Sequence, residues 1–379
     1  MANILLNLLA ARSGGQITRA SAFLDRIKKI SPSNDFIILK DSEVLNDLSY
    51  SEKFHVHNFR FENKKFKVVK RFIWENIELP KLIKKYKIDL YLTFSHYVPR
   101  SLNKTPSVVG ITNLAPFSIE AIKSERFLVR LKLKLLKKTI LSSANRANSI
   151  IAISKKCRKI LIDHGIDDKK IIVNPNGVDD FWTEEDKSNY NHERFDISEP
   201  FILYVSHFHF YKNHENLIIA FSKLPKKIQD NHKLVFIGKA QDRYCFNYLK
   251  NLIKNLELND KIVIIDGLDQ KSLRKFYQKS KLFAFPSLIE NCPNILLEAM
   301  RSGCAIISSK LDPMPEFCEE NVVYFDPLDP LNIRDRIFHT LSDADLRVSL
   351  SKSSQKQSLM YSWDNFTHKV SKEIDKILR

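Results

Sequence analysis

The stretch that decides the fold runs from Phe283 to Glu316 and reads FAFPSLIENCPNILLEAMRSGCAIISSKLDPMPE. An apolar strand ends at Phe285–Pro286, and a polar loop follows it. A helix begins near Pro293, because proline in the first turn costs the helix no hydrogen bond. A second apolar run at Cys304–Ser308 predicts another strand. Strand, helix and strand in this order are typical of a βαβ unit in a parallel sheet.

Outward from this stretch, short apolar runs alternate with amphipathic segments along the whole chain. A first series of strands is expected at Asn3–Leu9, Asp35–Leu39, Phe54–Asn58, Ile88–Phe94, Ser107–Ile111, Ser149–Ile153 and Ile171–Asn174. A second series is expected at Phe201–Val205, Lys233–Ile237, Lys261–Ile265, Lys281–Phe285 and Cys304–Ser308. Segments such as Gln16–Ile30 and His214–Leu224 have the apolar spacing of helices. The fold class is therefore α/β, with two successive Rossmann-like halves.

The length of 379 residues favours two domains. The alternation stops between Val178 and Pro200, where the sequence is polar and without period, and we interpret this stretch as the interdomain linker. The first domain is predicted at 1–185 and the second at 200–360. An amphipathic segment at Tyr361–Arg379 predicts a last helix.

The composition points to a folded protein of a reducing compartment. Hydrophobic residues make up 44% and charged residues 28%, and no apolar run approaches the roughly 20 residues of a membrane-spanning helix. The N-terminus reads as a buried strand rather than a signal peptide. The five cysteines are odd in number and form no CxxC pair, which favours the cytoplasm. The net charge of +17 calls for an anionic partner, but no RNA-binding signature or zinc finger is present, so nucleic acid is not expected.

Two acidic residues flank the predicted helix start near Pro293. Glu290 precedes the helix, and Glu298 lies one to two turns inside it. A helix N-terminus directs N–H groups and a positive dipole end outward, which suits a diphosphate. A preceding carboxylate can accept hydrogen bonds from sugar hydroxyls, and a later one can accept them from a ribose. The alternative is that Glu290 merely complements the helix dipole and Glu298 is solvated.

These residues resemble a known family. Glu290 and Glu298, followed by LLEAMRSGCAIISS, resemble the E-x7-E motif of the retaining glycosyltransferases of family 4, which have the two-Rossmann GT-B architecture. Further segments match in the order and spacing of the family: SIIAIS (149–154), IIVNPNGVD (171–179), YVSHFHFYKNHENLIIAF (204–221), LVFIGKA (234–240) and MPE (314–316). The resemblance covers nearly the whole chain. It implies two parallel sheets facing across a deep cleft, with the last helix returning to the first domain.

The resemblance also implies roles for individual residues. Glu290 would hold the donor sugar's hydroxyls, Glu298 the ribose, and Lys212 the diphosphate. The amides of the loop 291–295 would face the phosphates, except at Pro293, which has no N–H. The implied donor-binding set is Gly14, Gly15, Ser206, His207, Lys212, Asn213, Gly238, Glu290, Asn291, Cys292, Asn294, Ile295 and Glu298, with Glu290 and Lys212 as the catalytic residues.

The chain departs from the family pattern at two places. The family usually carries a Gly-Arg pair before the lysine, and this chain has Ser206–His207 there, so either His207 or a neighbour substitutes or one cation is lost. A histidine commonly follows the fifth strand near the acceptor, and this chain has Thr112 or Asn113 instead. His96, after the fourth strand, is a candidate to lie close by; a lone loop histidine is otherwise structural or solvated.

The resemblance implies a reaction as well. A hexose-type sugar would pass from a nucleotide-diphosphate donor to a saccharide or lipid-linked acceptor, in polysaccharide or lipopolysaccharide synthesis. No metal or other cofactor is expected. The one Asp-x-Asp, Asp343–Asp345, is interpreted as a solvated helix start.

The segment 123–138 carries seven Lys or Arg and one acidic residue, interleaved with apolar residues at helical spacing. It is either an interfacial helix attracted to anionic lipid or an ordinary surface helix with solvated lysines. The first reading places the protein on the inner face of the cytoplasmic membrane.

Three rival functions remain. A sugar-nucleotide epimerase shares the GT-B architecture and releases the nucleotide without an acceptor. A catalytically degenerate binding subunit of the same fold is suggested by Ser206–His207 and Thr112. The third is a basic nucleic-acid-binding protein, whose binding would depend on salt.

Overall fold

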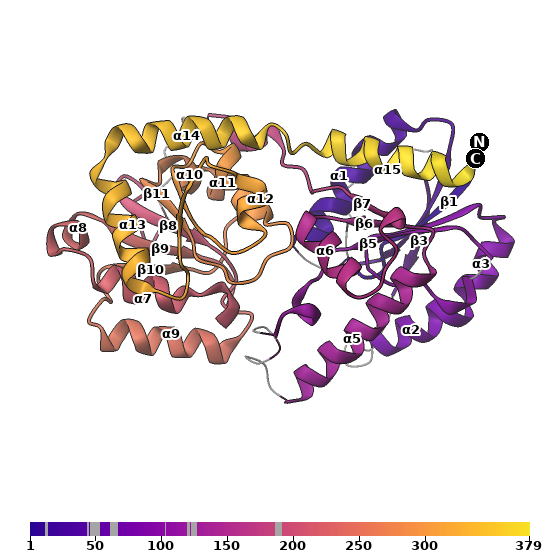
Figure 1. Ribbon diagram of the computed structural model, residues 1–379, viewed down its shortest axis with the longest axis horizontal. Helices are drawn as coiled ribbons and strands as arrows, with labels where there is room; N and C mark the ends of the chain where they lie inside the picture. Colours follow the sequence, from indigo (N-terminus) through magenta and orange to yellow (C-terminus); the bar gives the residue numbers. More distant parts are fainter. Residues whose placement is uncertain are drawn as a thin grey trace. The chain divides into compact units, whose positions relative to one another are not determined.

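Two units, each built on its own parallel sheet, divide the chain in the computed structural model (Figure 1). The first unit comprises Met1–Gly177 and Ser362–Arg379, and the second comprises Val178–Tyr361. The residues that the structure describes are 1–11, 14–43, 45, 54–60, 67–102, 104–119, 122, 127–185 and 192–379.

The first unit has a seven-stranded sheet in the order β3-β2-β1-β4-β5-β6-β7, and every neighbouring pair is parallel. Its strands are β1 (Asn3–Asn7), β2 (Asp35–Asp41), β3 (Phe54–Phe59), β4 (Leu90–Thr93), β5 (Ser107–Ile111), β6 (Ser149–Ala152) and β7 (Ile171–Val173). The central strands are buried over their whole length, as expected for a parallel sheet covered by helices.

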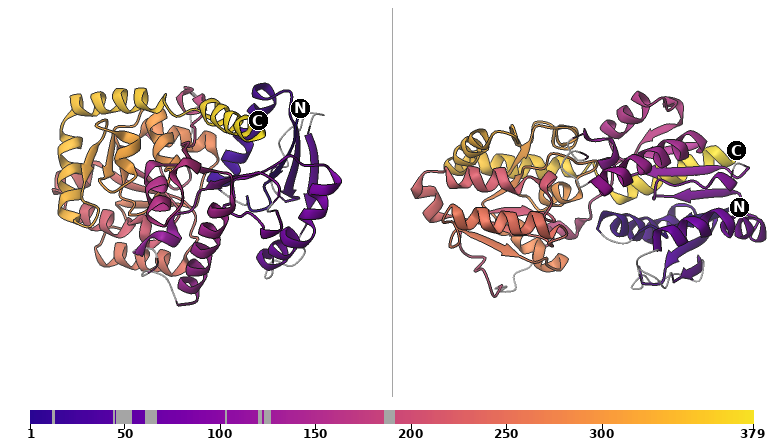
Figure 2. Two further views of the ribbon diagram at one scale, coloured as in Figure 1. Left: turned by 45° about the vertical axis from the view of Figure 1, so that its right-hand side comes forward. Right: turned by 90° about the horizontal axis from the view of Figure 1, so that it is seen from below.

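Helices connect and cover these strands. They are α1 (Gly15–Ile30), α2 (Lys67–Ile77), α3 (Leu79–Lys85), α5 (Phe127–Arg146) and α6 (Lys155–Asp163), with 3₁₀ turns η1 (Arg100–Leu102), η2 (Ala115–Phe117) and η3 (Asp168–Lys170). The last helix, α15 (Trp363–Leu378), belongs to the first unit and packs against α1. The two helices can be followed side by side in Figures 1 and 2.

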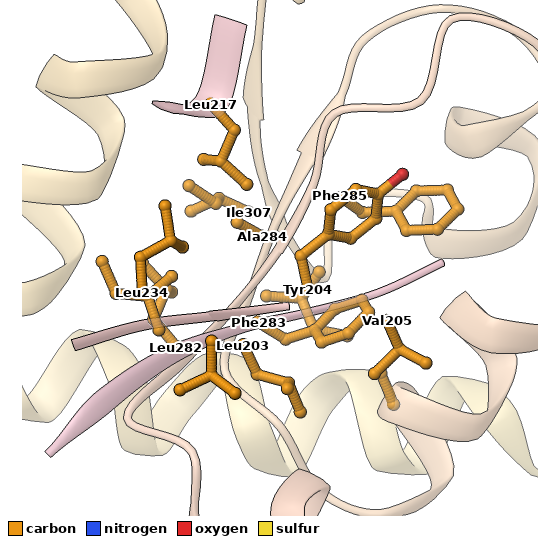
Figure 3. Packing of buried hydrophobic residues seen from close by; sticks show 14 of the residues in the cluster. Leu203, Tyr204, Val205, Leu217, Leu234, Leu282, Phe283, Ala284, Phe285 and Ile307 are labelled. Atoms are coloured by element: carbon orange, nitrogen blue, oxygen red, sulfur yellow. The ribbon is translucent and has the colours of Figure 1, made fainter. Parts of the chain in front are cut away.

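The second unit has a six-stranded parallel sheet in the order β10-β9-β8-β11-β12-β13. Its strands are β8 (Phe201–Val205), β9 (Lys233–Ile237), β10 (Ile262–Ile265), β11 (Leu282–Phe285), β12 (Ile306–Ser309) and β13 (Val323–Phe325). Figure 3 shows the centre of its core, where side chains of β8 and β11 meet those of the neighbouring elements.

The helices of the second unit are α7 (His214–Ser222), α8 (Lys226–Asn231), α9 (Arg243–Asn255), α10 (Gln270–Lys279), α11 (Asn294–Arg301), α12 (Met314–Cys318), α13 (Pro330–Ser342) and α14 (Ala344–Ser358), with η4 (Asp180–Thr183) and η5 (Phe210–Lys212). Asp343 caps α14, because its carboxylate accepts the Leu346 N–H at 2.8 Å. The interpretation of Asp343–Asp345 as a helix start is therefore confirmed.

Each of the twelve strands expected from the sequence is present, and no strand end is shifted by more than two residues. The strand that sequence reasoning missed is β13, which has three residues and pairs only with β12 among the described strands. So short a segment carries too little periodicity to be recognised, and its pairing with β12 makes it a strand.

The linker assignment at 178–200 needs a correction. The division between the units lies at Gly177, so Val178–Glu185 belong to the second unit and not to the first domain, which was predicted to extend to residue 185. Trp182 and Phe195 are buried in the second unit's core. Trp182 lies in a 3₁₀ turn and Phe195 in an isolated bridge with His192, and neither has a regular period that would reveal it in the sequence.

Within the described residues, no helix is both long enough and apolar enough to cross a membrane. The basic segment 123–138 lies only partly within them: residues 127–138 form the first part of α5, and residues 123–126 are outside the described ranges.

We predict that Gly177→Ala destabilises the first unit. A Cβ at Gly177 would lie 2.1 Å from the Trp363 N and 2.4 Å from the Ser362 carbonyl carbon, so the start of α15 would have to move. The expected loss is about 3 kcal/mol, the upper part of the usual range for overpacking. Thermal unfolding by calorimetry measures it.

The matched control is Gly165→Ala, where a Cβ would meet nothing within 4 Å and only the φ of +82° causes strain. If Gly177→Ala melts no lower than Gly165→Ala, the close approach of α15 to Gly177 is not a constraint on stability.

Candidate functional site

The residues of the implied donor site lie mostly at one edge of the second unit's sheet. Ser206 and Gly238 directly follow the neighbouring strands β8 and β9, and Glu290 follows β11. Parallel strands of one sheet have their carboxyl ends at the same edge. The loops that follow these strands therefore lie close together, although they are far apart in the sequence. Ligands of open parallel sheets bind at this edge.

An ion pair connects two of these loops. The Lys212 Nζ lies 2.6 Å from the Glu290 Oε1, and both side chains are largely buried, with exposed fractions of 14% and 13%. The structure thus brings together the two residues that the sequence nominated as catalytic, 78 positions apart.

Local hydrogen bonds hold Lys212 in place. The Tyr204 hydroxyl, from β8, donates to the Lys212 carbonyl at 2.8 Å. Asn213 adopts a left-handed backbone with φ of 61° and caps α7, and its side-chain amide donates to the Pro286 and Pro327 carbonyls at 3.1 and 2.7 Å. Asn213 therefore positions Lys212, while its own amide is engaged within the protein.

The electrostatics keep Lys212 charged. Burial lowers the pKa of Lys212, but the charge of Glu290, the electrostatic effect of Tyr211 and the hydrogen bond to Glu290 outweigh burial, and the pKa is raised above its usual value. The Tyr211 ring lies 5.4 Å from the Lys212 Nζ. The ammonium is thus available as a cation at neutral pH.

Glu298 lies in α11 as expected, in a different electrostatic setting. Its Oε2 accepts a long hydrogen bond of 3.4 Å from the Tyr277 hydroxyl of α10. Burial raises the pKa of Glu298 to about 8; the Tyr277 hydrogen bond opposes this shift, and the charge of Asp179 adds to it. The carboxylate is poorly stabilised by the protein, and hydroxyl donors of a ligand would stabilise it.

The loop between Glu290 and α11 differs in part from the expectation. The helix begins at Asn294, close to the predicted start, but Pro293 is its N-cap and not a residue of the first turn as expected. The backbone N–H of Asn294, however, donates to the Cys292 carbonyl at 3.0 Å. This N–H is therefore engaged inside the loop instead of facing outward. Asn291 is buried, and Cys292 and Ile295 are partly exposed beside it.

Gly238 is needed where β8 and β9 end. A Cβ there would lie 1.9 Å from the Ser206 carbonyl oxygen, so the glycine lets the two loops approach each other. His207 follows Ser206 and stands where the family has arginine. Burial lowers the pKa of His207, and the charges of Lys212, His209 and Lys239 lower it further. The lowered pKa favours the neutral form of the His207 imidazole.

The first unit carries the remaining candidates. Gly14 caps α1 with φ of 53°, and Gly15 is the first residue of that helix. A Cβ at Gly14 would meet nothing within 4 Å, so the backbone conformation alone favours glycine there. The two glycines lie at the N-terminus of a 16-residue helix, as the sequence predicts.

His96, Thr112 and Asn113 share one edge of the first unit's sheet, because β4 and β5 are neighbours and both end there. The backbone N–H of His96 donates to the Gly110 carbonyl at 3.1 Å. Its Nδ1 is buried and has no hydrogen-bond partner within the described ranges. Burial lowers the pKa of His96 to about 4, and the charge of Arg71 lowers it further. The Asn113 Oδ1 accepts the Ala115 N–H and stabilises its own turn.

Sequence reasoning missed three residues around the ion pair and the acid in α11. Tyr277 contacts Glu298, Tyr211 lies beside Lys212, and His214 is fully buried behind it. Burial lowers the pKa of His214 to about 3, and the Lys212 charge contributes, so His214 adds no charge to the site. Tyr211 and His214 adjoin Lys212 in sequence and were recognisable there; Tyr277 carries no such signal.

In the described part of the chain, no three His, Cys, Asp or Glu side chains converge as ligands for a metal ion. The groups suited to a ligand are the Lys212 ammonium for a phosphate, and Glu290 and Glu298 for hydroxyls.

We predict that Glu298→Gln stabilises the second unit by an amount that increases with pH. The folded protein binds the Glu298 proton more tightly than the unfolded chain does, since the pKa is about 8 when folded and about 4.5 otherwise. Stability attributable to this proton is present below about pH 4.5 and is lost as the pH rises to about 8. Urea unfolding of both proteins across this range measures the difference.

Glu320→Gln is the control, because Glu320 is an exposed acid of the same unit. A difference between Glu298→Gln and the wild type that stays constant between pH 5 and pH 8 (about three units apart) would contradict the assigned pKa.

With the geometry established, comparison with known proteins identifies the family. The model of glycosyltransferase family 4 matches residues 42–180, and that of the glycosyl transferases group 1 matches residues 186–357. The serotype-specific mannosyltransferase WbdA of Escherichia coli is 29% identical over 234 residues, which cover 60% of this chain and 29% of WbdA. The O-antigen chain mannosyltransferase RfbU of Salmonella typhimurium is 25% identical over 251 residues, covering 65% of this chain and 64% of RfbU.

Among solved structures, HepE of Anabaena in complex with UDP and glucose superposes with a TM-score of 0.74 at 15% identity, covering 99% of this chain and all of HepE. At that identity the likeness concerns the fold, which is GT-B with two Rossmann-like domains. The matched region of this chain spans less than a third of the length of WbdA. Since the two family models follow each other along the chain and meet near the boundary between the units, the chain belongs to the group 1 glycosyltransferases of family 4.

Proposed function

We propose that the protein is a retaining glycosyltransferase that moves a hexose-type sugar from a nucleotide-diphosphate donor to a saccharide or lipid-linked acceptor. The observation that carries the proposal is the buried pair of Lys212 and Glu290 at the sheet edge, 2.6 Å apart. A cation and an acid held there match the two demands of such a donor, a leaving diphosphate and a sugar with hydroxyl groups.

The donor would rearrange this pair. Its diphosphate would take the Lys212 ammonium as a counter-ion, and Glu290 would accept hydrogen bonds from the sugar hydroxyls in place of the ammonium. The ribose hydroxyls would donate to Glu298, which would offset the burial that raises its pKa to about 8. Each acid would thus exchange its present partner for hydroxyl donors of the ligand.

In the reaction, the bond between the anomeric carbon and the diphosphate oxygen breaks, and a bond to the acceptor oxygen forms on the same face. The acceptor's proton goes to an oxygen of the leaving phosphate. Negative charge grows on that phosphate, and Lys212 stabilises it. This route needs no strong base from the protein, and we propose that it needs no metal ion. Lys239, whose charge acts on His207, is available to supply a second cation in place of the family arginine.

The names of the relatives support the biological setting. WbdA and RfbU are mannosyltransferases, and RfbU acts on the O-antigen chain. We propose that this protein likewise builds a cell-surface polysaccharide or lipopolysaccharide, on the cytoplasmic side of the membrane. The basic helix α5 would then associate with anionic lipid, which would bring the enzyme to a lipid-linked acceptor.

We predict that Lys212→Ala and Glu290→Ala each lower kcat for transfer by roughly 100- to 1,000-fold, the usual cost of removing one group that stabilises the transition state. The assay measures sugar transfer to an acceptor in the presence of EDTA, which removes divalent metal ions. Transfer should persist there, because in the proposed route Lys212 stabilises the charge of the leaving group without a metal ion.

Lys310→Ala is the matched control, since it breaks the exposed pair of Lys310 and Asp326, which has a similar N–O distance of 2.8 Å. Transfer that survives in both site variants would rule out the assigned roles and leave a different site to be found. Conversion of the donor with no acceptor present would identify an epimerase instead.

We also predict that one nucleotide sugar of a panel stabilises the protein strongly against heat. A ligand at a hundred times its dissociation constant adds about 2.7 kcal/mol to the free energy of unfolding. The shift is expected to shrink in Glu298→Gln, because a neutral amide accepts hydrogen bonds from the ribose less strongly than a carboxylate. If no nucleotide sugar raises the melting temperature of the wild type, the donor class is wrong.

A further inference from the structure

Helix α2 in the first unit presents its apolar side chains outward. Val68, Val69, Phe72, Ile73 and Ile77 are each about half exposed, at 49–57%. A surface helix of a globular protein normally buries such a stripe and exposes its polar residues. In α2, Trp74 packs on the core, but the five residues named above are exposed, so within the described residues this apolar face lacks a partner.

Polar contacts on the inner face hold α2 in this orientation. Glu75 is buried, its Oε1 accepts the Asn7 side-chain amide at 2.9 Å, and its Oε2 lies 3.6 Å from the Arg71 Nε. The neighbouring Asn76 amide donates to the Tyr97 hydroxyl at 2.7 Å. Turning the helix to bury its apolar stripe would break these bonds and leave Asn7 and Glu75 without partners, at a substantial cost.

Helix α5 adds a second exposed apolar stripe. Phe127, Leu128, Leu131 and Leu135 are between 48% and 78% exposed and recur at helical spacing. The buried residues of this helix all lie in its C-terminal half, namely Ile140, Ser143 and Ala144. Five cations accompany the stripe: Arg130, Lys132, Lys134, Lys137 and Lys138.

A pocket of about 280 Å³ lies between the two helices. Phe72 of α2 and Tyr97 form apolar walls, and Arg100, Lys138 and Arg146 supply three cations; none of the described lining residues is acidic. The Arg146 guanidinium donates to the Ser142 hydroxyl and the Val98 carbonyl, and its buried Nε has no partner in the described ranges. Burial lowers the pKa of Arg146, Tyr97 opposes this, and the charge of Arg100 lowers it further. An anion in the pocket would relieve this clustering of positive charge.

We propose that the face formed by α2 and α5 rests on an anionic bilayer, with the phosphate of one lipid headgroup in the pocket lined by Arg100, Lys138 and Arg146. A headgroup phosphate complements the three cations, and the adjoining hydrocarbon complements the apolar stripes on either side. The inference rests on the membrane association proposed above, and it adds α2 and a defined lipid site to it. It leaves the donor site in the second unit unchanged.

Co-sedimentation with vesicles tests the proposal. Wild-type protein is mixed with vesicles of phosphatidylcholine alone or of phosphatidylcholine with phosphatidylglycerol, and we expect binding only to the second. Arg100→Glu with Lys138→Glu should weaken that binding at least about tenfold, because each cation at an anionic surface contributes appreciably to the affinity. Phe72→Ser with Ile73→Ser should weaken the vesicle binding as well. The four substituted residues are all exposed, so both double variants are expected to fold.

The matched control is Lys352→Glu with Lys369→Glu, which makes the same change in net charge at exposed positions outside the pocket. Binding close to that of the wild type in this control would support a localised site. Equal weakening in the control, equal binding to phosphatidylcholine alone, or no binding of the wild type to either vesicle would overturn the proposal.

Two further measurements are needed. The first distinguishes a lipid headgroup from a soluble phosphate in the pocket, and the second distinguishes failure of the lipid-site proposal from failure of the glycosyltransferase proposal. If glycerol 1-phosphate raises the melting temperature while vesicles do not bind, the pocket holds a soluble phosphate and the lipid proposal is wrong. Nucleotide-sugar stabilisation is measured on the same variants. If it is absent in the wild type while vesicle binding persists, the glycosyltransferase proposal fails and the lipid site stands.

Discussion

The close approach of the loops at the carboxyl ends of β8, β9 and β11 is the constraint on which the candidate site depends. Parallel strands place these loops at one edge, and Gly238 lets the loops after β8 and β9 approach closely, because its missing side chain leaves room for the Ser206 backbone. Tyr204 and Asn213 then tie the turn that carries Lys212 to the strand beneath it and to the loop after β11. These backbone arrangements place Lys212 within 2.6 Å of Glu290, where the two side chains form an ion pair.

The two acids of the motif have opposite electrostatic situations, and this difference suits their proposed roles. Glu290 already has a cation as its partner, so a donor has to exchange one set of charged contacts for another. Glu298 has only a long hydrogen bond from Tyr277, and burial raises its pKa to about 8. A ribose would provide the hydroxyl donors that the protein does not, and binding would thereby stabilise a carboxylate that folding alone disfavours.

The first unit distributes polarity in an unusual way. Its interior holds a hydrogen-bonded cluster of Asn7, Glu75 and Tyr91, while α2 and α5 expose apolar stripes around a cationic pocket. Buried polar groups are costly unless each has a partner, so this cluster also fixes which face of α2 can turn outward. The buried polar cluster therefore determines both the orientation of α2 and the apolar composition of the surface that α2 exposes.

Much of this protein follows from the sequence alone, because local patterns carry the information. Apolar runs and helical spacing predict both sheets, and the ordered motifs from residue 149 to residue 316 predict the family and the residues at the sheet edge. What only the tertiary structure decided are contacts without a local signal. The pairing of β13, the burial of Trp182 and Phe195 in the second unit, the contact of Tyr277 with Glu298 and the outward face of α2 each depend on neighbours distant in the chain. Periodicity reports which side of a segment is apolar, but the partner that covers that side is set by packing and by the satisfaction of buried polar groups.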